Sequence, residues 1–128
     1  MTEQYQSLLD ECKDIQYFLE EVVSDDPHEL AERLSKLCVY MARSGAILAD
    51  AKYMQDRARR GVYDVYFDQI MRMSATVASK FIESETGEMN YLVNWADRIN
   101  KSCTHQADSL RTMLSYAKEN LKLTRIGY

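Results

Sequence analysis

Apolar residues recur along this chain at intervals of three and four positions, which is the spacing of one face of an α-helix. The first such series runs through residues 3–23, with acidic residues between its apolar members. These members are Tyr5, Leu8, Cys12, Ile15, Leu19 and Val22. The series predicts an amphipathic helix over residues 3–23 that buries one side.

Helix-capping signals follow this first segment. In Ser24-Asp25-Asp26-Pro27 a favourable N-cap residue, Asp26, stands directly before a proline, which is favoured at the first position of a helix. Glu29 then lies in the first turn, where the helix dipole stabilises a negative charge. The sequence therefore predicts that a second helix begins at residue 27.

This second helix is predicted to reach at least residue 60. Its apolar face is formed by Leu30, Leu34, Leu37, Met41, Ser44 or Gly45, Leu48 and Ala51. Small residues at Ala42, Gly45, Ala46 and Ala49 predict that a neighbouring helix crosses there, because small side chains let two backbones approach. Gly61 weakens a helix by about 1 kcal/mol without ending it. Whether the helix continues through Gly61 into the apolar residues 62–73 is therefore left open.

Two more helices are predicted in the second half of the chain. Ser74 is an N-cap for a short helix over residues 75–84, and Thr86 stands where it could cap the next element. A long helix over about residues 88–123 then has its apolar face at Leu92, Ala96, Ile99, Cys103, Ala107, Leu110, Leu114, Ala117 and Leu121. Near Gln106 the apolar positions are twice in succession four residues apart, which should locally straighten a left-handed supercoil of the helices.

These segments predict an all-α fold. A single Pro and four Gly residues are typical of few, long elements rather than of turn-rich β architectures. Helices with one apolar face bury it best against each other, so we expect an elongated antiparallel bundle. It would be built on a long helical hairpin with the N-terminal helix packed against it. The length of 128 residues allows one domain, spanning residues 1–128.

Neither a membrane segment nor a disulfide framework is predicted. No stretch approaches the roughly 18 apolar residues of a membrane span, and the acidic N-terminus differs from a secretory signal. We therefore expect a cytoplasmic protein without membrane association. Cys12, Cys38 and Cys103 are far apart and odd in number, which argues against disulfides and CxxC metal sites. All three are predicted to be small buried apolar residues.

Charge is distributed unevenly along the chain, although its net value is only −4. Residues 1–32 hold ten acids and one base, whereas residues 98–128 hold six bases and two acids. This polarity favours a first helix that lies near the last one, or steering of a charged partner.

The residue types that catalysis and metal binding require are poorly represented. The only histidines, His28 and His105, lack a second ligand at helical spacing on an inward face. Glu20-Glu21 begins the carboxylate pattern of helical nucleotide pyrophosphohydrolases, but the pattern fails at its third acid. Ser115 has no neighbouring general base, and there is no glycine-rich phosphate loop. We therefore predict no enzyme activity, no metal and no cofactor.

A basic and aromatic cluster gives a first candidate contact surface. It consists of Lys52, Arg57, Arg59 and Arg60, followed by Tyr63, Tyr66 and Phe67. Cations beside exposed rings can hold a single nucleic-acid strand through its phosphates and bases. Alternatively, the cations complement a helix end and the rings pack inward. Because the pI is about 5.2, nucleic-acid binding is an alternative that the composition does not favour.

A polar line on the last helix gives a second candidate. Helical spacing aligns Thr104, Asp108, Arg111, Ser115, Lys118 and Lys122. Asp108 and Arg111 are spaced to form an ion pair worth a few tenths of a kcal/mol. A solvent-exposed helix face accounts for the line most simply. The other interpretation is a polar contact surface, either in a homo-oligomer or for a partner protein.

Three stretches carry a resemblance that covers roughly residues 45–121. They are LADAKYM, SATVASKFIE and NWADRINKSCTHQADSLRTMLSYAKENL, the last with an Arg-Thr-x-x-Ser-x-x-Lys pattern at Arg111, Thr112, Ser115 and Lys118. These stretches resemble small all-helical proteins of bacteriophages and prophages, a type with no established activity. The resemblance implies an accessory protein of phage DNA metabolism that works beside single-strand annealing recombinases.

Together these patterns predict a non-enzymatic interaction protein. Long apolar faces in so few helices leave part of one face uncovered, and symmetric self-association is the usual way to cover it. A homo-oligomer is therefore expected, with a further protein partner as an addition. The alternatives are single-strand binding and a small acidic inhibitor of a host defence or nucleic-acid enzyme. An inhibitor would need the acids of residues 3–23 exposed rather than neutralised by the basic C-terminal helix.

Overall fold

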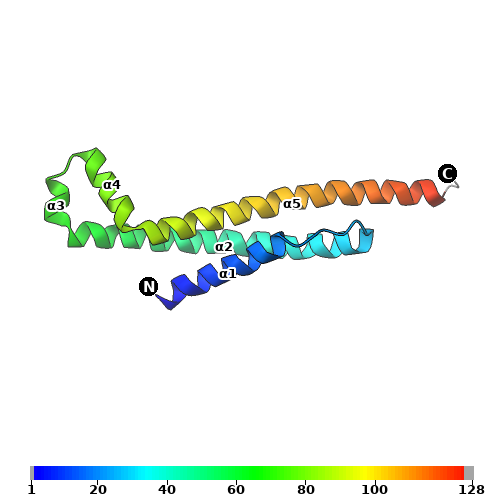
Figure 1. The fold of residues 1–128 in the computed structure, drawn as a ribbon, viewed down its shortest axis with the longest axis horizontal. Coiled ribbons are helices and arrows are strands. Elements are labelled where there is room, and N and C mark those ends of the chain that lie inside the picture. The colour runs from blue at the N-terminus through cyan, green and yellow to red at the C-terminus, as the bar shows by residue number, and fades with distance from the viewer. Residues whose placement is uncertain (1, 126–128) are drawn as a thin grey trace.

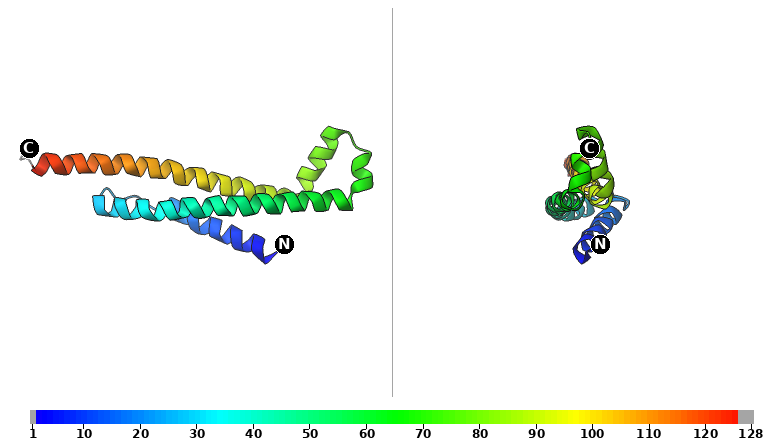
Figure 2. Two further views of the ribbon diagram at one scale, coloured as in Figure 1. Left: turned by 180° about the vertical axis from the view of Figure 1, so that it is seen from behind. Right: turned by 90° about the vertical axis from the view of Figure 1, so that its left-hand side faces the viewer.

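The computed structural model describes residues 2–125, and all of the regular elements in this part of the chain are helices (Figure 1). The helices are α1 (Glu3–Leu19), α2 (Pro27–Val65), α3 (Phe67–Met71), α4 (Ala75–Glu85) and α5 (Gly87–Arg125). The long helices α2 and α5 pack antiparallel, and α1 lies along them (Figure 2). The predicted elongated bundle on a helical hairpin is therefore confirmed.

The core lies between α2, α5 and α1. Side chains at most 2% exposed on these helices include Cys12, Ile15, Leu37, Ile47, Ala51, Leu92, Ala96, Ile99, Cys103, Ala107 and Leu110. On α5 the predicted apolar face is buried from Leu92 to Leu110. Beyond that point Leu114 and Ala117 are half-buried and Leu121 is 54% exposed. Figure 1 shows why: the end of α5 extends past the beginning of α2, so the core has no partner helix there.

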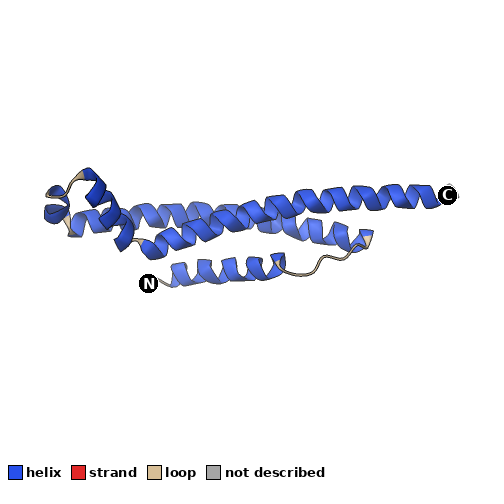
Figure 3. Cartoon of the chain, turned by 45° about the horizontal axis from the view of Figure 1, so that its top comes forward, coloured by secondary structure: helices blue, strands red, loops and turns tan. Residues whose placement is uncertain are grey.

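Helix α1 is shorter than predicted, because it ends at Leu19 rather than at residue 23. Two of its last carbonyl groups are hydrogen-bonded by other helices: Arg33 Nη2 donates to the Phe18 carbonyl at 2.9 Å, and Gln106 Nε2 donates to the Leu19 carbonyl at 3.1 Å. The chain then leaves as a loop toward α2 (Figure 3). The predicted inward position of Val22 is wrong, since this side chain is 97% exposed.

Helix α2 begins as predicted and continues through Gly61. Asp26 Oδ2 accepts a hydrogen bond from the Glu29 backbone N–H at 3.1 Å, with Pro27 in the first turn. A Cβ at Gly61 would meet no atom within 4 Å, so no neighbour constrains the helix there. The predicted face is confirmed at Leu30, Leu37, Ser44 and Ala51, which are buried. Ile47, which was not predicted, is fully buried as well, while Leu48 is half-buried. The reason is that α2 contacts both α1 and α5.

The predicted close crossing at small residues is wrong for most of them. Ala42, Ala46 and Ala49 are exposed. A polar contact joins α2 to α5 instead: Asn100 Nδ2 donates to the Met41 carbonyl and to Ser44 Oγ, each at 3.1 Å. A Cβ at Gly45 would lie 3.6 Å from Asn100 Nδ2. Small residues alone thus did not indicate which side of the helix faces a neighbour.

The short helices α3 and α4 form the corner of the hairpin. Ser74 caps α4 as predicted, because its hydroxyl accepts from the Val77 N–H at 3.3 Å. The Thr86 hydroxyl does not cap α5; it donates back to the Ile82 carbonyl at 2.8 Å and is buried at the end of α4. Edge-to-face packing of Tyr66 on Phe81, with ring centroids 5.2 Å apart, holds α4 to the end of α2.

The cysteines differ from one another in environment. Cys12 and Cys103 are at most 1% exposed, as predicted. Cys38 is exposed, so the prediction of a buried residue is wrong there. It follows the buried Leu37 by one position, which turns its side chain to the outer side of α2. Burial raises the pKa of the Cys12 thiol to about 11.

Within residues 2–125, every helix is either too short or too polar to form a transmembrane segment.

Candidate functional site

The acidic end of the chain does not lie on the basic end. Tyr5 donates to the Glu88 carbonyl at 3.2 Å and Gln106 bonds the end of α1, so α1 runs along residues 88–106 of α5. The first helix does lie near the last one, but the bases from Arg111 onward are beyond it. Cations of α2 pair with two acids instead: Arg33 with Glu21 at 3.5 Å, and Arg43 with Glu11.

Most of the remaining acids in this region face solvent. Those that are exposed and in no ion pair among residues 2–125 are Glu3, Asp10, Asp14, Glu20, Asp25, Asp26 and Glu29. None of the ion pairs in this part of the chain joins α1 to α5. The exposed acids that an inhibitor would need are therefore present, and binding to a target enzyme stays a prediction.

The end of α5 exposes several large apolar side chains. We call residues 111–125 the α5 tail. Here Tyr116 is 71% exposed, Leu121 54%, Leu123 49% and Met113 37%. Beside them, a groove of about 450 Å³ is lined by Asp25, Leu30, Thr112, Met113, Tyr116, Ala117 and Asn120. Met113 and Tyr116 thus lie uncovered beside the beginning of α2.

A second groove lies between the end of α1 and α2. It has a volume of about 500 Å³ and is lined by Asp14, Tyr17, Phe18, Glu21, Lys36, Val39 and Tyr40. Tyr17 is 75% exposed and Val39 67%, so its walls are apolar and open to solvent. We call this surface the acid-rimmed groove, because Asp14 and Glu21 line it, together with the cation Lys36. Sequence periodicity missed it, since Tyr17 and Val39 are outside both predicted apolar faces.

The basic cluster on α2 is exposed. Lys52, Arg57, Arg59 and Arg60 form none of the ion pairs found within residues 2–125. The guanidinium of Arg57 lies 5.9 Å from the centroid of the Tyr53 ring. We call Lys52, Tyr53, Arg57, Arg59, Arg60, Tyr63 and Phe67 the basic-aromatic patch.

The aromatic residues of the predicted cluster divide into two groups. Tyr63 is 41% exposed and Phe67 50%, with their rings 6.0 Å apart in an edge-to-face arrangement. Tyr66 is half-buried against Phe81. Inward packing therefore accounts for Tyr66 alone, while Tyr63 and Phe67 remain accessible beside the cations.

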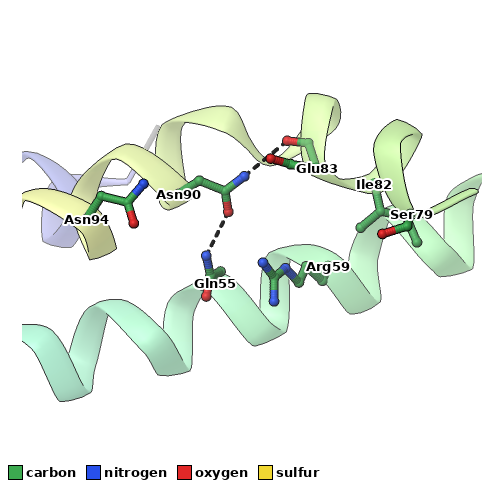
Figure 4. A pocket seen from close by; sticks show the side chains of 7 residues that line it. All are labelled: Gln55, Arg59, Ser79, Ile82, Glu83, Asn90 and Asn94. Atoms are coloured by element: carbon green, nitrogen blue, oxygen red, sulfur yellow. Dashed lines mark hydrogen bonds between the residues drawn. The ribbon is translucent and has the colours of Figure 1, made fainter. Parts of the chain in front are cut away.

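A polar cleft at the hairpin corner was not predicted from the sequence. Its lining residues come from α2, α4 and α5, namely Gln55, Arg59, Ser79, Ile82, Glu83, Asn90 and Asn94 (Figure 4). Gln55 Nε2 donates to Asn90 Oδ1 at 2.7 Å, and Asn90 Nδ2 donates to the Glu83 carbonyl at 3.1 Å. These bonds link three helices. The cleft offers hydrogen bonding and the opposite charges of Arg59 and Glu83.

The polar line on α5 is solvent-exposed, which agrees with its simplest interpretation. Thr104, Asp108, Arg111, Ser115, Lys118 and Lys122 are all exposed. The predicted ion pair between Asp108 and Arg111 is confirmed at 3.0 Å. Arg111, Ser115 and Lys118, which carry the phage resemblance, share this face with no core contact that would explain their identity.

The histidines and acids do not converge on a common point. His28 lies 3.2 Å from Glu32 one turn along α2, with both side chains exposed. Among residues 2–125, no three His, Cys, Asp or Glu side chains are arranged to hold a metal ion. Fold and surfaces together define an all-α hairpin bundle with exposed charged, polar and apolar side chains. Comparison of the chain with protein-family models, curated proteins and solved structures gives no match.

Proposed function

We propose that this protein is a non-enzymatic helical interaction protein that self-associates through the α5 tail. The observation that carries the proposal is the exposure of Tyr116, Leu121 and Leu123 on a helix that extends beyond its partners. Covering one such Leu side chain is worth about 1.5–3 kcal/mol. Tyr116 and Leu123 lie two turns apart on one side of the helix, and Leu121 lies on another side. Exposed apolar side chains of this kind mark interaction surfaces, and homo-oligomers commonly cover them symmetrically.

The polar groups inside the bundle support a binding role rather than a catalytic one. Arg33 with Gln106, Asn100 with Ser44, and Gln55 with Asn90 each join two helices. No buried side-chain nitrogen or oxygen in the described part of the chain lacks a hydrogen-bond partner. The hydrogen bonds between helices thus explain why these polar side chains lie inside the bundle.

The proposal is tested by the molar mass in solution. Size-exclusion chromatography with light scattering should give twice the chain mass of 14.9 kDa. Leu121→Ser should weaken the dimer by about 10-fold or more, since it removes most of one buried Leu. Val77→Ser is the matched control, because Val77 is 53% exposed at the opposite end of the molecule. A wild-type monomer at millimolar concentration would refute self-association.

A second candidate function is binding of single-stranded nucleic acid by the basic-aromatic patch. It is favoured by one observation: four cations that form no ion pair within residues 2–125 lie on the same stretch of chain as the exposed rings of Tyr53, Tyr63 and Phe67. Such surfaces combine phosphate contacts with base stacking. The interspersed Asp56 and Asp64 reduce the net positive charge, which is why this function ranks second.

Fluorescence polarisation with a labelled oligothymidine tests the second function. We expect a Kd of the order of micromolar at low salt that weakens steeply as NaCl rises. Arg57→Ala, Arg59→Ala and Arg60→Ala together should abolish this binding. Replacing the exposed Lys13, Lys36 and Arg98 by Ala removes equal charge elsewhere and should leave the affinity within about twofold. Equal losses in both triple variants would exclude a localised site.

An accessory role in phage DNA metabolism is proposed from the sequence resemblance. Its support is the shared exposed face of Arg111, Ser115 and Lys118 on the α5 tail. Neighbouring genes that encode recombination or replication proteins are the expected context. Genes of unrelated cellular metabolism on both sides would argue against it.

A further inference from the structure

The polar cleft at the hairpin corner lies beside the basic-aromatic patch, and Arg59 belongs to both. On α2, Arg59 follows Lys52 by seven residues and Tyr63 follows Arg59 by four, which places all three along one face of the helix. Gln55, which lines the cleft, lies one turn from Lys52 and one turn from Arg59. The cleft is therefore next to the row of cations on which the second candidate function depends.

Hydrogen bonds between three helices hold the cleft in shape. Gln55 donates to the Asn90 side chain, and Asn90 donates to the Glu83 carbonyl. Both ends of the Asn90 amide are thus used within the protein. Among the seven lining residues, no hydrogen bond involves the side chain of Arg59 or Asn94 (Figure 4). These two side chains can therefore bind a ligand without giving up a contact inside the cleft.

Opposite charges line the cleft without neutralising each other. Arg59 comes from α2 and Glu83 from α4, and both side chains are exposed. Neither forms an ion pair within residues 2–125. A simple anion would be attracted by Arg59 but repelled by Glu83. The cleft instead suits a neutral group that offers acceptors to the guanidinium and donors to the carboxylate.

A guanine base has this combination of groups. Its O6 and N7 atoms are neighbouring acceptors, and arginine is their commonest partner. Its imino and amino groups are neighbouring donors on the Watson–Crick edge, which proteins read in unpaired bases. No other standard base has two acceptors on one edge and two donor groups on the next. The cleft volume of about 420 Å³ also lies within the range of small-ligand sites.

We infer that the polar cleft binds a guanine base of a single strand whose phosphates follow the basic-aromatic patch. Arg59 donates to guanine O6 and N7, and the Glu83 carboxylate accepts from the imino and amino groups. This inference rests on the proposed nucleic-acid binding and adds a base preference to it. Phosphate contacts and stacking on Tyr63 are tolerant of sequence, whereas contacts to base edges are specific.

Oligothymidine with and without one central guanosine tests the inference by fluorescence polarisation. A single guanosine is used because guanine-rich strands associate with one another. It should tighten binding by about 10-fold, which is the scale of one bidentate contact to a base. Adenosine or cytidine at the same position should change the affinity by less than about threefold, since each matches only part of the pattern.

Two variants of α4 locate the preference. Glu83→Ala removes the acceptor for the guanine donors, so the ratio of the affinities with and without guanosine should fall to about one. The Glu83 carbonyl that binds Asn90 remains, so the fold should be retained, which far-UV circular dichroism checks. Glu85→Ala is the matched control, because Glu85 is exposed on the same helix but does not line the cleft. This control should keep the wild-type ratio.

Guanosine monophosphate distinguishes a base within a strand from a free nucleotide. The free nucleotide lacks the phosphate contacts along the patch, so it should compete at least about 10-fold more weakly than the guanosine-containing strand. Competition as strong as that of the strand would overturn the inference, because the patch would then contribute nothing to the binding of the base.

The remaining outcomes refute different statements. Oligothymidine binding without a guanosine preference would overturn the inference and leave nucleic-acid binding by the patch intact. A preference that survives Glu83→Ala would overturn the placement of the base in the cleft. Absence of binding to either oligonucleotide at low salt would refute the proposed nucleic-acid binding itself, and the inference with it.

Discussion

Arg33 and Gln106, which are 73 residues apart in sequence, form a two-point hydrogen bond between α2 and α5. Gln106 Oε1 accepts from Arg33 Nε at 3.0 Å and from Nη2 at 2.8 Å. The Arg33 guanidinium also lies 4.5 Å from the centroid of the Phe18 ring and donates to the Phe18 carbonyl. Gln106 in turn donates to the Leu19 carbonyl. These two side chains therefore fix the end of α1 against the hairpin.

Replacing Gln106 by Leu should destabilise the protein by about 2–3 kcal/mol. The Arg33 side chain is only 10% exposed, so its donors would lose their acceptor without full access to water. Urea denaturation followed by circular dichroism measures the loss. Gln69→Leu, at an exposed position of α3, should stay within about 0.5 kcal/mol of the wild type. Equal effects of the two changes would contradict a stabilising role of the hydrogen bonds between Arg33 and Gln106.

Gly61 lies inside α2, so substitutions there should follow helix propensity. Gly61→Ala should stabilise the protein by about 1 kcal/mol, because the added Cβ has no neighbour within 4 Å. Gly61→Pro should destabilise it by about 3 kcal/mol or more, since proline removes a helical hydrogen bond. Thermal unfolding of the two variants distinguishes them. A neutral proline would show that α2 ends before this position.

The three thiols should react at different rates. Cys38 is exposed, whereas Cys12 and Cys103 are buried. Ellman's reagent at pH 8 should therefore modify one thiol per native chain quickly and the other two only on unfolding. Cys38→Ser should remove the fast phase and leave the slow phases unchanged. Rapid modification of all three thiols in the native protein would mean that the core opens readily.

Alkaline pH should destabilise the protein through Cys12. Burial raises the pKa of this thiol to about 11, from about 9 in the unfolded chain. Above pH 9 the unfolded state loses the proton while the native state keeps it, so stability falls from pH 9 to pH 11. Cys12→Ala should remove this part of the pH dependence, whatever its cost at pH 7. Urea midpoints of both proteins at pH 7 and pH 10.5 test the difference.

The ion pair between Arg43 and Glu11 should contribute little, although it joins α2 to α1. Arg43 Nη2 lies 2.8 Å from Glu11 Oε1, but the two side chains are 45% and 36% exposed. Water and salt screen such a pair, so a double-mutant cycle with Arg43→Ala and Glu11→Ala should give a coupling of no more than about 1 kcal/mol. A coupling of several kcal/mol would indicate that the pair is desolvated in solution.

Much of the fold was predictable because the determining signals are local. Asp26 and Ser74 cap the helices that follow them, as their residue types indicated. The apolar face of α5 was correct from Leu92 to Leu110, where α2 and α1 both pack against α5. Local signals failed where a distant group intervened. Leu19 ends α1 where Gln106 binds its carbonyl, and no residue near position 19 indicates that contact.

The candidate surfaces were less predictable than the helices. The cations of the basic-aromatic patch could be identified, because four of them follow closely in sequence. Which aromatic rings are exposed could not be predicted, since Tyr66 is covered by Phe81 of another helix. The acid-rimmed groove and the polar cleft each combine residues of different helices, so no sequence window contains them.

The sequence by itself determined the helical class, the hairpin and the uneven charge of the two ends, because helix formation and net charge depend on residue types and their spacing. Only the tertiary structure decided which acids face Arg33 and Arg43, which apolar side chains of the α5 tail stay uncovered, and where grooves lie. Those outcomes depend on how far each helix extends past its neighbours, and relative helix position is set by contacts between residues distant in sequence.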